Sequence, residues 1–116
     1  MTEEGVLQKT NRINLLFDFY ERLLTEKQQT FMKHYFHDDY SLGEIASEFN
    51  ISRQAVYEHI KRAESVLEEY ESKLRLLDKY EKRQPLLQSL TALAGELPSG
   101  QSEALVTLVD RLQAID

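Results

Sequence analysis

Residues 41–62 constrain the fold more than any other stretch, because they combine two helical patterns with a tight turn. Ser41 and Glu44 have the spacing of a capping box, in which each side chain accepts the other residue's backbone N–H. Apolar residues then recur at helical spacing as far as Phe49. Asn50 follows, and asparagine tolerates the left-handed backbone that a sharp turn needs. These residues predict a helix that begins after Ser41 and ends at Asn50.

A second helix is predicted directly after the turn. Ser52 is its capping residue, and Val56, Ile60 and Ala63 recur on its inward face. Ala46, in the preceding helix, is small at the position where the two helices should cross. The pattern predicts a helix-turn-helix whose second helix takes the recognition position. The alternative is an ordinary pair of packed helices, because motif matches carry a false-positive risk.

The outward face of this second helix carries the side chains that we expect to contact double-stranded DNA. They are polar, charged or aromatic: Arg53, Gln54, Tyr57, Glu58, Lys61 and Arg62. Arginine pairs bidentately with guanine, glutamine pairs with adenine, and glutamate accepts from cytosine. The net charge of the whole chain is −6, which argues against a strong nonspecific DNA binder. Any positive DNA-binding surface is therefore local to this helix.

Composition indicates an all-α protein of one small domain with an appendage. The chain has 116 residues, of which 41% are hydrophobic, and only two prolines and four glycines. The absence of cysteine excludes disulfides and thiolate zinc sites. We find no apolar run of membrane-spanning length and therefore expect a cytoplasmic protein without membrane insertion. The predicted parts are an N-terminal helical unit, residues 1–63, and a packing or dimerisation region, residues 64–116.

Helical patterns flank the motif on both sides. One runs from about Thr10 to Leu24, and Thr25 with Gln28 forms another capping box before the next helix. After the motif, neither glycine nor proline occurs between residues 52 and 84, so we expect the recognition helix to continue that far.

The continuing helix carries a heptad seam with apolar spacings of three and four from Ile60 to Leu77. Pro85 is then expected to start a new helix and Ser102 to cap a last one. Because these two short helices are too small for a core of their own, we expect a homodimer held through the long helix and the C-terminal pair. A monomer in which the pair folds back on the seam is the alternative.

The chemistry of the side chains favours neither an enzyme nor a metal protein. His34, His37, Asp38 and Asp39 lie close together in the sequence, but no further ligand from another element is identifiable, so we interpret them as surface residues. The sequence lacks the glycine-flanked serine of a hydrolase and a glycine-rich phosphate loop. The acidic run from Glu64 through Glu71 is interpreted as a solvated face that repels DNA. We expect no catalysis, no cofactor and no bound metal.

Two family resemblances extend this interpretation. Residues 24–67 resemble the C-terminal promoter-reading region of bacterial sigma factors, on the run LTEKQQTFMKHYFHDDYSLGEIASEFNISRQAVYEHIKRAESVL. Residues 10–25, TNRINLLFDFYERLLT, joined to that run and to the long helix, look like the YlxM family of small bacterial helix-turn-helix proteins. Nothing matches the sigma regions that bind the −10 element or core polymerase.

The YlxM resemblance implies an all-helical fold and DNA binding through the second helix of the motif. Genes of that family tend to lie beside those for signal recognition particle components, which implies a role in that pathway or in its regulation. The expected function is thus a helix-turn-helix regulator, with duplex DNA and particle components as the implied partners. The alternative is a non-enzymatic adaptor of the same pathway that keeps the motif as a scaffold.

Overall fold

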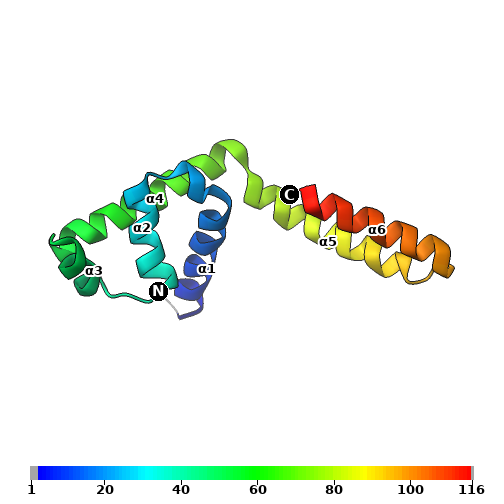
Figure 1. The fold of residues 1–116 in the computed structure, drawn as a ribbon, viewed down its shortest axis with the longest axis horizontal. Helices are drawn as coiled ribbons and strands as arrows, with labels where there is room; N and C mark the ends of the chain where they lie inside the picture. The colour runs from blue at the N-terminus through cyan, green and yellow to red at the C-terminus, as the bar shows by residue number, and fades with distance from the viewer. Residues whose placement is uncertain (1–2, 116) are drawn as a thin grey trace. The chain divides into compact units, whose positions relative to one another are not determined.

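The computed structural model describes residues 3–115, with side chains from residue 10 onward. All regular secondary structure in this part of the chain is helical, which confirms the all-α prediction (Figure 1). The elements are α1 (Glu3–Tyr20), η1 (Glu21–Leu23), α2 (Glu26–Met32), η2 (Lys33–His37), α3 (Leu42–Phe49), α4 (Arg53–Leu74), α5 (Leu76–Ala94) and α6 (Ser99–Ile115). They form two compact units, Met1–Leu77 and Asp78–Asp116.

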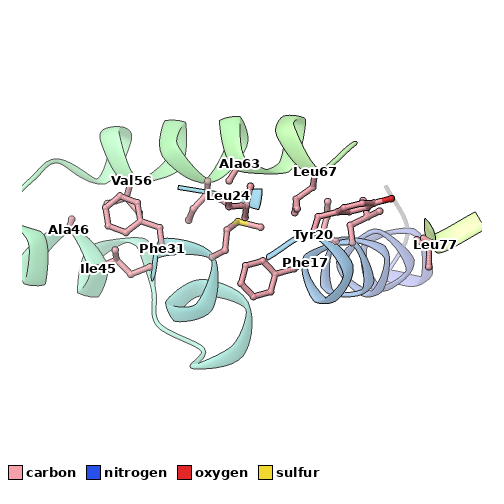
Figure 2. Packing of buried hydrophobic residues seen from close by; sticks show 14 residues of the cluster. Phe17, Tyr20, Leu24, Phe31, Ile45, Ala46, Val56, Ala63, Leu67 and Leu77 are labelled. Carbon is pink, nitrogen blue, oxygen red and sulfur yellow. The ribbon is translucent and has the colours of Figure 1, made fainter. Parts of the chain in front are cut away.

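The core of the first unit forms where α1, α2 and α3 each pack against α4 (Figure 2). Its largest fully buried side chains come from all of these helices and from the start of α5: Leu16, Tyr20, Phe31, Met32, Ile45, Val56, Leu67 and Leu77. Burial of such apolar side chains is the main force that holds the short helices α2 and α3, which are too short to be stable alone.

The predicted helix starts and turn of the motif are confirmed. Thr25 Oγ1 accepts from the Gln28 backbone N–H at 3.2 Å, and the Gln28 side chain accepts from the Thr25 N–H at 3.0 Å. Ser41 and Glu44 make the same reciprocal pair at 3.1 and 3.3 Å. Asn50 has the predicted left-handed backbone, with φ 56° and ψ 45°. α1 begins at Glu3, however, earlier than the predicted Thr10.

The prediction of one helix from Ser52 to Gln84 is wrong. α4 ends at Leu74, Arg75 adopts a left-handed conformation with φ 57°, and α5 begins at Leu76. The Arg75 N–H still donates to the Glu71 carbonyl at 2.9 Å, as a helix C-cap does. Pro85 lies inside α5 rather than at a helix start, so α5 lacks the backbone bond that its missing N–H would have made.

The heptad seam also has a different role from the predicted one. Ile60, Ala63, Leu67 and Leu77 are all buried in the core of the first unit, and Tyr70 is partly buried against it. Leu74, the remaining position of the seam, is 44% exposed. The helical spacing of the buried residues therefore serves packing within one chain. The four buried side chains are not available to a second copy of the protein.

Glu71 corrects the interpretation of the acidic run, because its side chain is buried rather than solvated. One carboxylate oxygen accepts from the Tyr20 hydroxyl at 2.6 Å and from the Leu77 N–H at 3.0 Å. The Tyr20 oxygen accepts in turn from the Leu76 N–H at 3.0 Å. Burial raises the pKa of the Tyr20 hydroxyl, and its bond to Glu71 acts in the same direction. A buried network thus satisfies the first backbone donors of α5 and explains the helix break.

The second unit is a helical hairpin of α5 and α6. Leu87, Ala94 and Val109 are its buried apolar residues. α6 begins at Ser99, three residues before the predicted cap at Ser102, whose N–H instead donates to the Pro98 carbonyl at 2.9 Å. None of the described helices is both long enough and apolar enough to cross a membrane.

We predict that the Tyr20–Glu71 network stabilises the first unit. Tyr20→Phe leaves the Leu76 N–H without its acceptor and should lower the free energy of unfolding by about 1–3 kcal/mol. Thermal and urea unfolding followed by circular dichroism measure this loss. Tyr35→Phe removes a hydroxyl from a half-exposed tyrosine and should leave stability nearly unchanged. Equal stability of Tyr20→Phe and the parent would contradict the proposed role of the network.

Ala46 provides a test of the crossing between α3 and α4. Ala46 is buried on α3, which packs against α4, and Val56 is fully buried, as predicted. Ala46→Leu overpacks this crossing and should cost about 1–3 kcal/mol of stability. Ser47→Leu adds the same side chain at the next, exposed position and serves as the matched control. A melting temperature for Ala46→Leu equal to that of the control would show that the crossing tolerates bulk.

Candidate nucleic-acid interface

The recognition helix α4 is held by its cap and by its inward face. Ser52 Oγ accepts from the Ala55 N–H at 3.0 Å, which fixes the first turn of the helix. Val56 and Ile60 are buried beneath α2 and α3. Because successive residues on a helix are rotated by about 100°, burial of these two side chains determines which residues point outward.

The six residues predicted to contact DNA lie on α4 between its first residue and its third turn. Arg53, Gln54, Tyr57, Glu58 and Arg62 are exposed, and Lys61 is partly buried. The Tyr57 side chain is an aromatic surface near the middle of the set and is 44% exposed. The structure thus brings together residues with the chemistry to contact bases and phosphates.

Weak pairs within the helix organise these charged groups. Glu58 accepts from Gln54 Nε2 at 3.4 Å and lies 3.9 Å from Arg62 Nη2. Lys61 Nζ is 3.3 Å from Glu64 and 5.5 Å from the centroid of the Tyr57 ring. The Arg62–Glu58 pair is exposed, and pairs of this kind contribute roughly 0–1 kcal/mol each. Arg62 can therefore exchange its carboxylate for a phosphate at little cost, whereas the Glu64 side chain that pairs with Lys61 is only 14% exposed.

Arg53 lies against the start of α3. A Cβ atom added at Gly43 would be 3.0 Å from Arg53 Nε and 3.1 Å from Nη2. The guanidinium therefore occupies space that any other residue at position 43 would partly fill. Gly43 was not among the predicted site residues, because its effect on Arg53 depends on how α3 and α4 pack.

Lys27 is a second residue that sequence reasoning missed. It lies on α2, with Nζ 5.8 Å from the Phe31 ring centroid, and Phe31 packs edge-on against the His59 ring at 5.2 Å. Desolvation is the largest influence that lowers the pKa of His59, and the positive charges of Lys27 and Arg62 lower it further. The positive surface near α4 thus includes α2 as well as the recognition helix.

The acidic residues after Arg62 limit this surface. Glu68 forms a two-point ion pair with Arg12 on α1, at 2.8 and 2.9 Å. Glu69 pairs with Lys73 at 3.1 Å. These carboxylates lie farther along α4 and disfavour contact with phosphates there. DNA contact is therefore best accommodated by the first three turns of the helix.

The histidine and aspartate cluster serves local structure. His34 Nδ1 lies 3.1 Å from Asp38, its Nε2 lies 3.7 Å from Glu48, and its ring stacks on Tyr40 at 4.8 Å. Across the part of the chain that the structure describes, no group of three or more potential ligands is placed to hold a metal ion. The cluster links η2 to α3, the first helix of the motif.

Comparison with known proteins agrees with this geometry. The family described as "UPF0122: Putative helix-turn-helix protein, YlxM / p13 like" matches residues 7–104. A UPF0122 protein of Shouchella clausii is 54% identical over 112 residues, which are 96% of this chain and 100% of that protein. The UPF0122 protein YlxM of Bacillus subtilis is 49% identical over 110 residues, which are 95% and 98% of the two chains. The similarity thus includes both compact units.

His59 should make stability depend on pH. Because its pKa is lowered in the folded protein, the folded state binds fewer protons than the unfolded state below the usual histidine pKa of about 6.5. Its contribution is fully present above that pH and is lost as pH falls through the lowered value. His59→Gln should flatten the decline in unfolding free energy between about pH 7 and 5. If the unfolding free energy of His59→Gln fell as steeply with pH as that of the parent, His59 would not be the source of the pH dependence.

Proposed function

Because the chain belongs to the YlxM / p13-like family of helix-turn-helix proteins, we propose that it is a regulator that binds duplex DNA through the outward face of α4. The main support is the presentation of six polar or aromatic residues along one helix whose opposite face is buried. In a helix-turn-helix, the N-terminal part of the recognition helix contacts base edges in the major groove. The regulator acts by occupying a site on DNA, without catalysis and without a cofactor.

The positions of the side chains suggest a division of roles. Arg53 and Gln54 lie in the first turn of α4 and are the proposed base readers. Lys61 and Arg62 lie two turns later and, with Lys27 on α2, are the proposed phosphate contacts. Glu58 contacts both Gln54 and Arg62, so it can orient them or accept from cytosine. Tyr57 is placed between the two groups.

The proposed biological context is the signal recognition particle pathway in the cytoplasm. This rests on the resemblance to the YlxM family and on its gene neighbourhood, rather than on any residue of the site. A homodimer would present two recognition helices to two half-sites. The alternative function is an adaptor that binds a protein of that pathway, and the net charge of −6 favours it.

Selection of bound sequences from a random duplex pool tests the proposal. A regulator should enrich a defined motif, and its affinity should fall steeply with salt. Pull-down from lysate with the same immobilised protein is the parallel experiment. If no DNA motif is enriched and a component of the signal recognition particle is captured, the adaptor function would be supported and the regulator function rejected.

Two substitutions should separate base reading from phosphate contact. Arg53→Ala should cost about 1–3 kcal/mol at one base pair of the selected site and relax specificity there. Lys61→Ala should weaken binding to all sequences alike and reduce the salt slope by about 1. Fluorescence anisotropy over a salt series measures both.

Lys73→Ala is the matched control for Lys61→Ala. Both lysines lie on α4 and pair with a glutamate of the same helix, at 3.3 Å for Lys61 and 3.1 Å for Lys73. Lys73 lies roughly 18 Å farther along the helix, at 1.5 Å per residue. Its removal should leave DNA affinity unchanged. Parent-like binding by Arg53→Ala and Lys61→Ala would refute DNA reading by this face.

A further inference from the structure

The hairpin of α5 and α6 exposes a large amount of apolar surface. The exposed residues are Leu86 at 67%, Leu90 at 37%, Leu93 at 57%, Leu97 at 40%, Leu108 at 54%, Leu112 at 52% and Ile115 at 81%. Added together, the exposed fractions of these seven residues correspond to about four fully exposed residues. Contiguous apolar patches of more than a few hundred Å² are uncommon on monomers and mark interaction sites.

These residues lie on one side of the hairpin. On α5, the exposed Leu86 and Leu93 each come one position before a buried residue, Leu87 and Ala94. On α6, the exposed Leu108 likewise precedes the buried Val109. One position corresponds to a rotation of about 100° of fixed hand, and the two helices run in opposite directions (Figure 1). Leu87, Ala94 and Val109 form the buried seam between α5 and α6. Because the exposed leucines of both helices have the same offset from this seam, they lie on the same side of the hairpin.

We propose that this apolar face, made of the seven exposed residues named above, is the docking surface for a second copy of the chain, packed as an antiparallel four-helix bundle. Two hairpins that pack face to face give each helix the second apolar neighbour that it lacks within one chain. A two-fold axis uses the same patch on both copies, so one surface is sufficient. Four residues of the earlier seam, Ile60, Ala63, Leu67 and Leu77, play no part, because they are buried in the first unit.

The distribution of charge favours a second copy over an unrelated partner. Between Gln84 and Val109 the only charged residues are Glu96 and Glu103, although 29% of the whole chain is charged. Depletion of charge is typical of interface cores. Glu103 lies six positions before Val109 and therefore on the opposite side of α6 from Leu108, whereas Glu96 lies in the turn. The apolar face is therefore nearly uncharged along its length, with Glu96 at its closed end.

The open end of the hairpin carries charges of both signs. Lys79 lies at the end of the first turn of α5, and Lys82 in the second turn pairs with Asp78 at 3.0 Å. Arg111 lies in the last two turns of α6 and is the cation beside the apolar face. Arg111 lines a pocket with Leu108, Leu112 and Ile115. An antiparallel arrangement places the turn of one copy over this pocket of the other. Leu97 then enters the pocket, and Glu96 faces Arg111.

Sedimentation velocity and light scattering at tens of micromolar test the surface. The parent should be a dimer. Leu86→Glu with Leu93→Glu should raise the dimer dissociation constant by at least about tenfold while helicity is retained, because both side chains are exposed in the single chain. Gln88→Glu with Ala92→Glu adds the same charge to the opposite face of α5 and should leave the dimer intact. A monomeric parent, or a dimer insensitive to the leucine changes, would overturn the proposal.

Cross-linking tests the antiparallel packing and does not depend on how the glutamate variants fold. The chain contains no cysteine, so Glu96→Cys with Arg111→Cys introduces the only thiols. Mild oxidation should give a covalent dimer of the double variant and leave each single variant monomeric under denaturing conditions. A covalent dimer of Glu96→Cys alone would show closed ends meeting and overturn the antiparallel arrangement. Absence of any cross-link in the double variant would do the same.

Discussion

The rest of the first unit depends on the buried carboxylate of Glu71. It accepts from the Tyr20 hydroxyl of α1 and from the Leu77 N–H of α5, and so joins three helices at one point. A buried carboxylate is stable only when hydrogen bonds replace its hydration, and here both donors come from groups that also need an acceptor. The network fixes the C-terminal end of α4 against α1. At the other end, Val56 fixes α4 against α3.

With both ends fixed, the outward face of the recognition helix cannot rotate independently of the core. This matters because the chain, at a net charge of −6, lacks a general attraction for DNA. Binding by such a protein must rely on short-range contacts from a pre-arranged surface. The pairs with Glu58 and Glu64 position Arg62 and Lys61, and the exposed Glu58 pair is weak enough for a phosphate to replace the carboxylate. A protein whose net charge repels DNA, but which has cations on one helix face, should favour sequence-specific binding over nonspecific binding.

Features governed by neighbouring residues could be predicted from the sequence. The capping boxes, the left-handed Asn50 and the spacing of Val56 and Ile60 depend on contacts within a few positions. The break at Arg75 could not, because Tyr20 and the core determine it from far away in the chain. Glu71 was misinterpreted for the same reason. At the candidate site, the α4 residues followed from the pattern, whereas Gly43 and Lys27 lie on other helices and depend on packing.

The first unit buries its apolar helix faces more completely than the second unit does, because more helices pack together in it. In the first unit, three helices pack on α4, so its inward stripe can be covered within one chain. In the second unit, two helices share a single seam, which buries Leu87, Ala94 and Val109 and leaves a second apolar stripe on each helix exposed. A helix with two apolar stripes needs two neighbours. The composition of the hairpin is therefore that of half a bundle, and in the proposed dimer a second hairpin of the same kind would supply the missing half.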